Sequence, residues 1–319
     1  MRKIGVLTSG GDAPGMNAAV RAVVRKSIYH GLEVTGIRRG FQGLIADDCL
    51  QLNLGSVADI IHRGGTVLRT SRSPEFMLES GRRAALNTVR ANGLDALVVI
   101  GGDGSFHGAA WLASAGVPTV GIPATIDNDL ACTDYCIGFD TAVNNVTEAI
   151  NKVRDTATSH ERVYVIEVMG RTSGHIALCA GLAGGAESIL LPELPFDLEQ
   201  VCQRLYRGVQ RGKLHSIILV AEGAGSALVI GEEIKQRTNM ETRVTILGHL
   251  QRGGTPTAFD RMLASRLGAT AVDLLLSGCH NQMVGLIGGE VRASAWTVAL
   301  AQRKEFPAEL YELANILAI

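Results

Sequence analysis

The stretch 123–129, PATIDND, groups side chains that can do chemistry. Thr125 brings a hydroxyl, Asn128 an amide, and Asp127 and Asp129 bring carboxylates, with no lysine or arginine among them. Such a group can act as a general base, hold a metal ion or orient a substrate hydroxyl. An acidic turn is the alternative, because Asp and Asn favour turns by bonding their own backbone.

Two glycine-rich stretches are further candidates: SGGDAPG at 9–15 and GGDGS at 101–105. Each follows a short apolar run and precedes a helical pattern, and such a loop exposes backbone N–H groups to an anion such as phosphate. Asp103, at a strand end, can hold Mg²⁺ together with nucleotide phosphates. The first loop matches neither common phosphate fingerprint, and an ordinary strand-to-helix turn is the alternative for both.

The elements that must position these loops are three apolar runs, at 4–8, 94–100 and 117–122. Each is typical of a buried parallel strand. In a doubly wound sheet, loops at the carboxyl ends of such strands meet on one edge. We therefore expect the three loops to converge on one site, which none of them would establish alone.

Strand-like and helical stretches alternate along the rest of the chain. This rhythm predicts an α/β fold of two Rossmann-like lobes, each a mainly parallel sheet flanked by helices, with the active site in the cleft between them. We expect a short helix over 56–62 and a last strand over 283–287. The larger lobe is placed at 1–138 plus 251–301, and the smaller lobe at 139–250 plus 302–319.

Composition argues against several classes of function. The net charge of −1 gives no reason to bind nucleic acid or an anionic membrane, and an aromatic content of 4% argues against base stacking. The six scattered cysteines lack zinc-site spacing and are expected as free thiols. No signal peptide and no apolar run long enough to cross a bilayer is present, so we expect a cytoplasmic protein.

Cationic residues recur at loop positions beside the strands of the second half of the chain. They are Arg162, Arg171, Arg243, His249 and Arg252. Arginine grips phosphate in a bidentate manner better than lysine does, so these residues can form a phosphate site. Solvated surface side chains are the alternative. Arg21 and Arg25, four residues apart on one expected helix, leave the same two possibilities open.

Five stretches, in order, are similar to motifs of the bacterial ATP-dependent 6-phosphofructokinases. They are LTSGGDAPGMN at 7–17, GGDGS at 101–105, TIDND at 125–129, EVMGR at 167–171 and LGHLQRGG at 247–254. The resemblance covers nearly the whole chain and is weakest after about residue 285. It implies a phosphotransferase that moves the γ-phosphoryl group of ATP to the 1-hydroxyl of fructose 6-phosphate, the committed step of glycolysis, with Mg²⁺ as cofactor.

The same resemblance implies roles for individual residues, with Asp127 as general base and Asp103 and Asp129 on the metal side. The implied catalytic set is Asp127, Arg171, Thr125, Arg72 and Gly11. The implied ATP contacts are Gly11, Arg72, Ser73, Gly102, Asp103, Gly104, Ser105 and Gly108. The implied contacts to fructose 6-phosphate are Thr125, Ile126, Asp127, Arg162, Met169, Gly170, Arg171, Glu222, Arg243, His249, Leu250, Gln251 and Arg252. In the family, Arg162 and Arg243 come from a neighbouring subunit, which implies a homotetramer with shared active sites.

Two small, neutral residues favour ATP over pyrophosphate as the donor. Pyrophosphate-using relatives carry Asp where this chain has Gly104, and Lys where it has Ala124. An Asp at 104 would repel the α-phosphate of ATP, whereas a Lys at 124 would add positive charge near pyrophosphate.

The family's regulatory site for ADP and phosphoenolpyruvate is largely present in this sequence. Its implied residues are Arg21, Arg25, Arg154, Gly185, Glu187, Arg211, Lys213 and His215. Leu54 and Leu214, however, replace two cations that are usual in the family. Losing a cation from an anion site costs about 1–3 kcal/mol, or roughly ten- to a hundredfold in affinity. We therefore expect weak or absent control by these effectors.

Two alternatives remain beside this sugar-phosphate kinase. The first is a non-catalytic nucleotide-sensing α/β protein, which the presence of Asp103, Asp127 and Arg171 disfavours. The second is a kinase of another substrate that shares the Gly-Gly-Asp-Gly loop. Nothing in such a kinase would require the stretches 125–129 and 249–252.

Overall fold

The computed structural model describes residues 1–318, which form two compact units. The first unit comprises Met1–Thr125, Leu130–Asp140 and Gly253–Lys304, and the second comprises Ile126–Asp129, Thr141–Arg252 and the residues from Glu305 onward. The expected lobe boundaries lie after residues 138, 250 and 301. The two units of the structure change over after residues 140, 252 and 304, two to three residues later. Residues 126–129 lie in the second unit, whereas the prediction placed them in the larger lobe.

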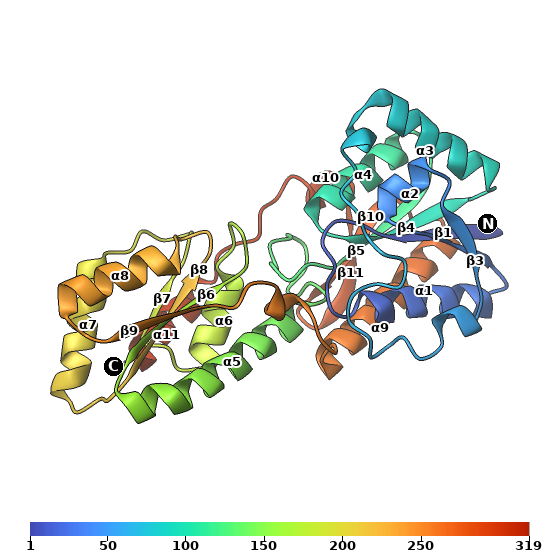
Figure 1. Cartoon of the computed structure of the whole chain (residues 1–319). Coiled ribbons are helices and arrows are strands. Elements are labelled where there is room, and N and C mark those ends of the chain that lie inside the picture. Colours follow the sequence, from blue (N-terminus) through green and yellow to red (C-terminus); the bar gives the residue numbers. More distant parts are fainter. Residues whose placement is uncertain (319) are drawn as a thin grey trace. The chain divides into compact units, whose positions relative to one another are not determined.

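The first unit is built on a seven-stranded sheet of order β11-β10-β5-β4-β1-β2-β3 (Figure 1). Its strands are β1 Lys3–Thr8, β2 Glu33–Ile37, β3 Cys49–Leu52, β4 Ala96–Gly101, β5 Thr119–Pro123, β10 Gln282–Ile287 and β11 Glu290–Ala295. The inner strands pair in parallel, and only the edge strands β3 and β11 are antiparallel to their neighbours. The expectation of a mainly parallel sheet is confirmed.

Two of the expected elements in this unit are wrong. The strand at 283–287 is not the last, because Gly288 and Gly289 take left-handed φ values of 59° and 84° and turn the chain back into β11. A two-residue turn with two positive φ values matches the twist of a hairpin. The expected helix over 56–62 is only a 3₁₀ turn, Gly55–Val57, and Asp59 already has a φ of 51°.

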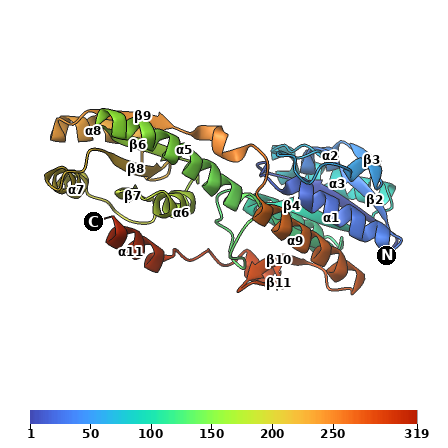
Figure 2. The same ribbon diagram turned by 90° about the horizontal axis from the view of Figure 1, so that it is seen from below.

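Helices cover both faces of the seven-stranded sheet. The helices of this unit are α1 Met16–Tyr29, α2 Gly40–Ile45, α3 Glu79–Ala91, α4 Asp103–Ser114, α9 Ala258–Leu276 and α10 Trp296–Ala299. Helices α1 and α9 lie side by side on one face, and α2, α3 and α4 lie on the other (Figures 1 and 2). A Cβ added at Gly268 would lie 2.7 Å from Ala22 Cβ, so the glycine lets α9 approach α1 closely.

The core of the first unit follows from the alternation of side chains along its strands. Leu7, Leu97 and Val99 are fully buried and join the cluster that includes Phe41 and Phe106 from α2 and α4. Burying such a side chain is worth about 1.5–3 kcal/mol each. The packed cluster holds the carboxyl ends of β1 and β4 in place, and the glycine-rich loops begin there.

The second unit contains a four-stranded parallel sheet of order β7-β8-β6-β9. Its strands are β6 Val163–Val168, β7 Ser188–Leu190, β8 Ser216–Ala221 and β9 Thr242–Ile246. Its helices are α5 Phe139–His160, which starts in the first unit, α6 His175–Ala183, α7 Leu198–Gln210, α8 Ala227–Thr238 and α11 Ala308–Leu317. Leu205 of α7 and Ile234 of α8 pack with Val165 and Val220 in one core (Figure 2 shows these elements). Within residues 1–318 no helix has both the length and the apolar character that a membrane crossing needs.

Candidate active site

Three loops converge at the carboxyl edge of the first unit's sheet, as the sequence predicted. Strand β4 lies between β1 and β5 and pairs in parallel with both. Ser9 N donates to Ile100 O at 2.9 Å, and Ala124 N donates to Gly101 O at 2.9 Å. A Cβ added at Gly102 would lie 3.7 Å from Thr125 Cβ. The loops therefore meet at the strand ends, where open α/β sheets bind ligands.

The first loop is fixed by its own backbone and by the segment that follows β3. Gly15 precedes α1 with a φ of 102°, and a Cβ there would lie 2.6 Å from Ile137 Cγ2. Thr70 Oγ1 donates to Gly10 O at 2.7 Å, and Thr8 Oγ1 donates to Arg69 O at 2.8 Å. No local sequence pattern predicts this role of Thr8 and Thr70, since nothing in the sequence pairs them with these carbonyls. Gly10, next to Gly11, is thus fixed in the loop between β1 and α1.

The second loop and its surroundings offer groups for a nucleotide. Asp103 is the first residue of α4, and its carboxylate is 61% exposed and 3.7 Å from His107 Nε2. Ser105 is buried, and a Cβ at Gly104 would meet nothing within 4 Å. Among residues 1–318, Ser73 Oγ is buried without a hydrogen-bond partner, which a bound ligand would supply.

Two other predicted nucleotide contacts differ in exposure: Gly108 is buried and Arg72 is exposed. Gly108 faces the Phe41 ring, because a Cβ added there would lie 2.6 Å from Phe41 Cζ. Its lack of a side chain therefore serves packing inside the first unit. Arg72 is exposed on the loop before Ser73, so its guanidinium is open to solvent and to a ligand.

Residues 1–318 do not form a complete metal cage. Within the described residues 1–318, no cluster of three or more His, Cys, Asp or Glu side chains that could hold a metal ion occurs. Asp103 belongs to the first unit and Asp129 to the second. Mg²⁺ is usually held by one or two carboxylates together with substrate phosphates and waters, so the exposed Asp103 carboxylate fits that mode of binding.

Asp127 is a buried carboxylate with a perturbed pKa. It is 7% exposed, and burial, reinforced by Asp129, raises its pKa from 3.8 to about 6. Arg171 opposes this rise, with Nε 3.6 Å from Asp127 Oδ2, but the Arg171 side chain is 63% exposed. Glu222 adds to the rise and Arg252 opposes it. At neutral pH the carboxylate is ionised yet basic enough to accept a proton.

Hydrogen bonds hold the backbone of Arg171, whereas its side chain is largely exposed. Its φ of 54° is left-handed, and Glu222 Oε1 accepts hydrogen bonds from Arg171 N at 2.7 Å and Gly170 N at 3.2 Å. Gly223 passes so close that an added Cβ would overlap Arg171 O. The turn is therefore rigid, while the guanidinium is mostly exposed beside Asp127.

The stretch 248–252 forms a 3₁₀ turn whose members differ in exposure. Gln251 is 1% exposed, and its Oε1 accepts from Met169 N at 3.1 Å while its Nε2 donates to Gly248 O at 3.0 Å. Its side chain is thus used to hold the backbone at Met169. Leu250 is 79% exposed and His249 is also exposed. Arg252 lies close enough to Asp127 to lower the pKa of that carboxyl.

Arg162 and Arg243 are brought together by one carboxylate. Glu241 Oε1 lies 2.9 Å from Arg162 Nε and 2.6 Å from Arg243 Nη2. Parallel pairing of β6 with β9 sets Tyr164 opposite Arg243, which explains why the two arginines meet. The pair forms a basic group at the edge of the second unit's sheet.

Five of the predicted effector residues belong to one neighbourhood of the second unit. Arg154 donates to Gly184 O and, at 3.4 Å, to Gly185 O, and Lys213 pairs with Glu187. Thr158 Oγ1 lies 3.2 Å from His215 Nδ1, and burial lowers the pKa of His215. Arg211 is exposed, and Arg21 and Arg25 belong to α1 of the first unit. Leu54 and Leu214 are 50% and 53% exposed.

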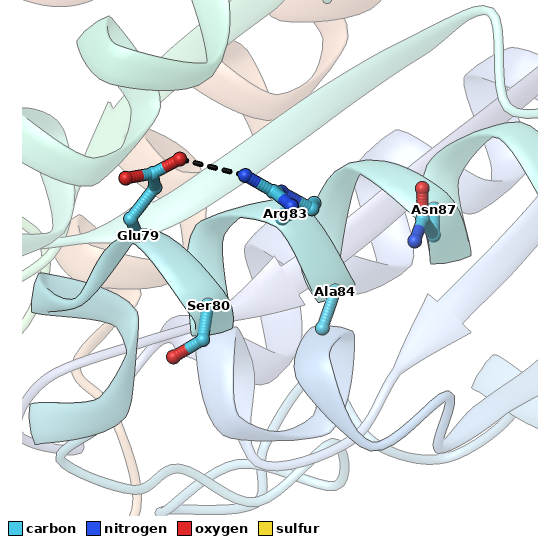
Figure 3. Close-up of a pocket in the computed structure, with 5 residues that line it drawn as sticks. All are labelled: Glu79, Ser80, Arg83, Ala84 and Asn87. Carbon is cyan, nitrogen blue, oxygen red and sulfur yellow. Dashed lines mark hydrogen bonds and ion pairs between the residues drawn. The ribbon is translucent and has the colours of Figure 1, made fainter.

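A surface hollow on α3 lies apart from the predicted residues. It is lined by Glu79, Ser80, Arg83, Ala84 and Asn87, all from that one helix (Figure 3). Glu79 and Arg83 form an exposed ion pair of 2.7 Å. Such a pair is a solvated i,i+4 contact worth a few tenths of a kcal/mol. Among the described residues, no group from another element lines the hollow, so we assign it no function.

Comparison with known proteins identifies the relatives of the chain. Residues 3–275 match the sequence family described as phosphofructokinase. The chain is 58% identical to the ATP-dependent 6-phosphofructokinase of Halothermothrix orenii and 57% identical to that of Halalkalibacterium halodurans, with 100% of each chain covered. The structure of Pichia pastoris phosphofructokinase in the T-state superposes with a TM-score of 0.90 at 35% identity, over 99% of this chain and 38% of that one. A pyrophosphate-dependent phosphofructokinase from Marinobacter aquaeolei shares the fold, with a TM-score of 0.88 at 24% identity over 97% of this chain and 86% of that one.

Proposed function

The chain belongs to the phosphofructokinase family, and from that premise we propose that it transfers the γ-phosphoryl group of ATP to the 1-hydroxyl of fructose 6-phosphate. The observation that carries the proposal is the buried Asp127 carboxylate with a pKa of about 6, 3.6 Å from Arg171. A sensor that only bound nucleotide would have no need of a base tuned in this way.

The proton and the phosphoryl group move in one balanced step. As the 1-hydroxyl oxygen bonds to the γ-phosphorus, its proton passes to Asp127, and the bond from that phosphorus to the bridging oxygen breaks to release ADP. A positioned base contributes about 10²–10⁴-fold to such a reaction. Charge on the transferring group is stabilised by Arg171, Arg72, Gly11 and Thr125. Enzymes catalyse phosphoryl transfer mainly by positioning the reactants and neutralising charge.

The nucleotide binds at the loops of the first unit. Gly11, Ser73, Gly102, Gly104 and Ser105 supply backbone and hydroxyl groups at the ends of β1 and β4, and the unpartnered Ser73 Oγ supports this assignment. ATP is the donor, in keeping with the small, neutral Gly104 and Ala124 at the positions where pyrophosphate users carry Asp and Lys. Asp103 would hold Mg²⁺, with Asp129 assigned to the metal by the family resemblance alone, and Mg²⁺ when bound neutralises phosphate charge.

Fructose 6-phosphate binds at the second unit. Ile126, Met169, Gly170 and Glu222 contact the sugar, with Leu250 and Gln251 shaping the same stretch of chain. The 6-phosphate is gripped by Arg162, Arg243, His249 and Arg252. The pairing of Arg162 with Arg243 on Glu241 supports their use as one bidentate phosphate site. By the family resemblance, Arg162 and Arg243 serve the active site of a neighbouring subunit, so the working form is a homotetramer. We place this tetramer in the cytoplasm.

The effector site binds ADP and phosphoenolpyruvate only weakly. Lys213 is already paired with Glu187, and Arg154 is bonded to backbone carbonyls. Leu54 and Leu214 add no charge to attract an anion. The remaining cations must therefore exchange existing partners for a phosphate, which weakens binding.

A coupled assay of ADP release with fructose 6-phosphate and Mg-ATP tests the activity. The wild type should turn over, and Asp127→Asn should lose at least about a hundredfold in kcat. Asp273→Asn is the matched control, because Asp273 of α9 is an exposed carboxylate paired with Lys26 of α1, and the variant should keep full activity. Nucleotide binding without turnover would favour the nucleotide sensor, and turnover of another acceptor would favour a kinase of another substrate.

A further inference from the structure

A chain of hydrogen bonds leads from a buried histidine to the backbone of the base. Ser173 Oγ donates to Asp127 O at 2.8 Å, and the same Oγ lies 2.7 Å from His175 Nδ1. Ser173 and His175 are 5% and 8% exposed, and all three residues belong to the second unit. Neither residue takes part directly in the transfer of the proton or the phosphoryl group.

The direction of this chain follows from the donors available. A carbonyl oxygen only accepts, so the single proton of the Ser173 hydroxyl is committed to Asp127 O. Ser173 Oγ must then accept from His175 Nδ1, because two lone pairs would otherwise face each other at 2.7 Å. His175 therefore carries a proton on Nδ1.

The turn that holds Ser173 cannot shift easily. Ser173 N donates to Gly170 O at 2.8 Å, and Gly174 N donates to Glu193 Oε1 at 2.8 Å. A Cβ added at Gly174 would lie 2.7 Å from Leu191 Cδ2, so the turn is packed closely against the segment after β7. Arg171 sits on the same turn. The backbone of the base and the arginine beside it are thus attached to one rigid support.

We propose that Ser173 and His175 are positioning residues for phosphoryl transfer. The Nδ1–H of His175 orients the Ser173 hydroxyl, which holds the Asp127 carbonyl and thereby sets the carboxylate at its distance from Arg171. Asn128, next in the chain, has a left-handed φ of 49°, so the backbone on that side of the base needs an external anchor. The proposal rests on the proposed function, because it assigns these residues to the same reaction.

Removing the hydroxyl should slow the reaction without weakening substrate binding. Ser173→Ala should lower kcat about tenfold. A misplacement of 1 Å at a reacting group lowers the rate by ~10²-fold, and the loss of the hydroxyl should displace the base by less than that. KM for both substrates should stay within about twofold. Ser173→Thr keeps the hydroxyl and should restore at least about half of kcat.

His175 should act only through Ser173. His175→Leu should lower kcat about threefold, because the hydroxyl can still donate to Asp127 O but loses its orientation. The double variant should be no slower than Ser173→Ala alone, as is expected of two residues that act as one unit. Thr238→Val is the matched control: Thr238 Oγ1 is a buried hydroxyl of the same unit that donates to Ile234 O at 2.7 Å, and its loss should leave kcat unchanged.

A readout that does not depend on activity is the histidine tautomer. In the ¹⁵N spectrum of histidine-labelled protein, the signal that disappears in His175→Leu should report a protonated Nδ1. An unprotonated Nδ1 would overturn the proposal, as would wild-type kcat in Ser173→Ala, or loss of kcat in Thr238→Val equal to that in Ser173→Ala. A wild type that does not phosphorylate fructose 6-phosphate would instead overturn the proposed function, while the tautomer would still test the hydrogen-bond chain.

Discussion

Replacing the Asp127 carboxylate by an amide should remove activity and at the same time stabilise the fold. The group is 7% exposed, and its pKa rises from 3.8 to about 6 on folding, mainly because of burial. Below pH 3.8 the carboxyl is neutral in the folded and unfolded chains, so the wild type bears no penalty there. As the pH rises through 6, the folded protein must hold a buried charge, and the stability that the neutral form had is lost.

The size of the effect follows from the pKa. A rise of about two units, at roughly 1.4 kcal/mol per unit, corresponds to about 3 kcal/mol at pH 8. Asp127→Asn is neutral at every pH, so it should exceed the wild type in free energy of unfolding by about that amount at pH 8. At pH 5 about half of the difference should remain.

Urea unfolding of both proteins at pH 5 and pH 8, at equal protomer concentration, measures this difference. Asp273→Asn, which removes an exposed carboxylate, should show no gain that grows with pH. An Asp127→Asn variant no more stable than the wild type at pH 8 would refute the reasoning. So would a gain of the same size at both pH values, since ionisation of the buried group would then not be its source.

Three further predictions concern catalysis, donor choice and regulation. The pH profile of kcat should show an acid limb near pH 6, falling about tenfold per unit below it, because the protonated base cannot accept a proton; a flat profile from pH 5 to 8 would contradict the assignment. Gly104→Ala should leave KM for ATP within about twofold, since a Cβ there meets nothing within 4 Å, whereas Gly104→Asp should raise it at least about tenfold through charge repulsion. Steady-state kinetics should show little inhibition by sub-millimolar phosphoenolpyruvate. Leu54→Arg combined with Leu214→Lys should strengthen the binding of this inhibitor about ten- to a hundredfold. Strong inhibition of the wild type would show that the two leucines do not weaken the effector site.

The convergence of the three loops was predictable from the sequence because two general rules suffice for it. Short apolar runs followed by glycines predict parallel strands, and parallel strands in a doubly wound sheet present their carboxyl ends together. The segment at α2 and β3 was missed, because Gly40 and Gly43 inside a short helix resemble a loop. The hairpin at Gly288 was missed for a related reason: two glycines indicate a turn but not the strand after it.

The details of the site depended on pairings that are distant in the sequence. Ser173 reaches Asp127 across 46 residues, and no local pattern signals that contact. The spacing of a serine and a histidine two residues apart was the only hint available. Gln251 shows the converse case, because it stands among predicted substrate contacts and yet its side chain is buried against Met169 N. Spacing identifies which residue types are available, but partners across the fold decide what each of them does.

The division of the chain between Thr125 and Ile126 has a consequence for how the protein can evolve. A single peptide bond joins Thr125, the last residue of the first unit's opening segment, to Ile126 beside the base, with no linker to absorb a change in length. Because consecutive Cα atoms are about 3.8 Å apart, Thr125 and Asp127 stay within about 7.6 Å of each other whatever the two units do. One inserted residue would raise that upper limit by half and change the spacing between Thr125 and the base. Length changes should therefore be absent here in active homologues, whereas surface loops tolerate them.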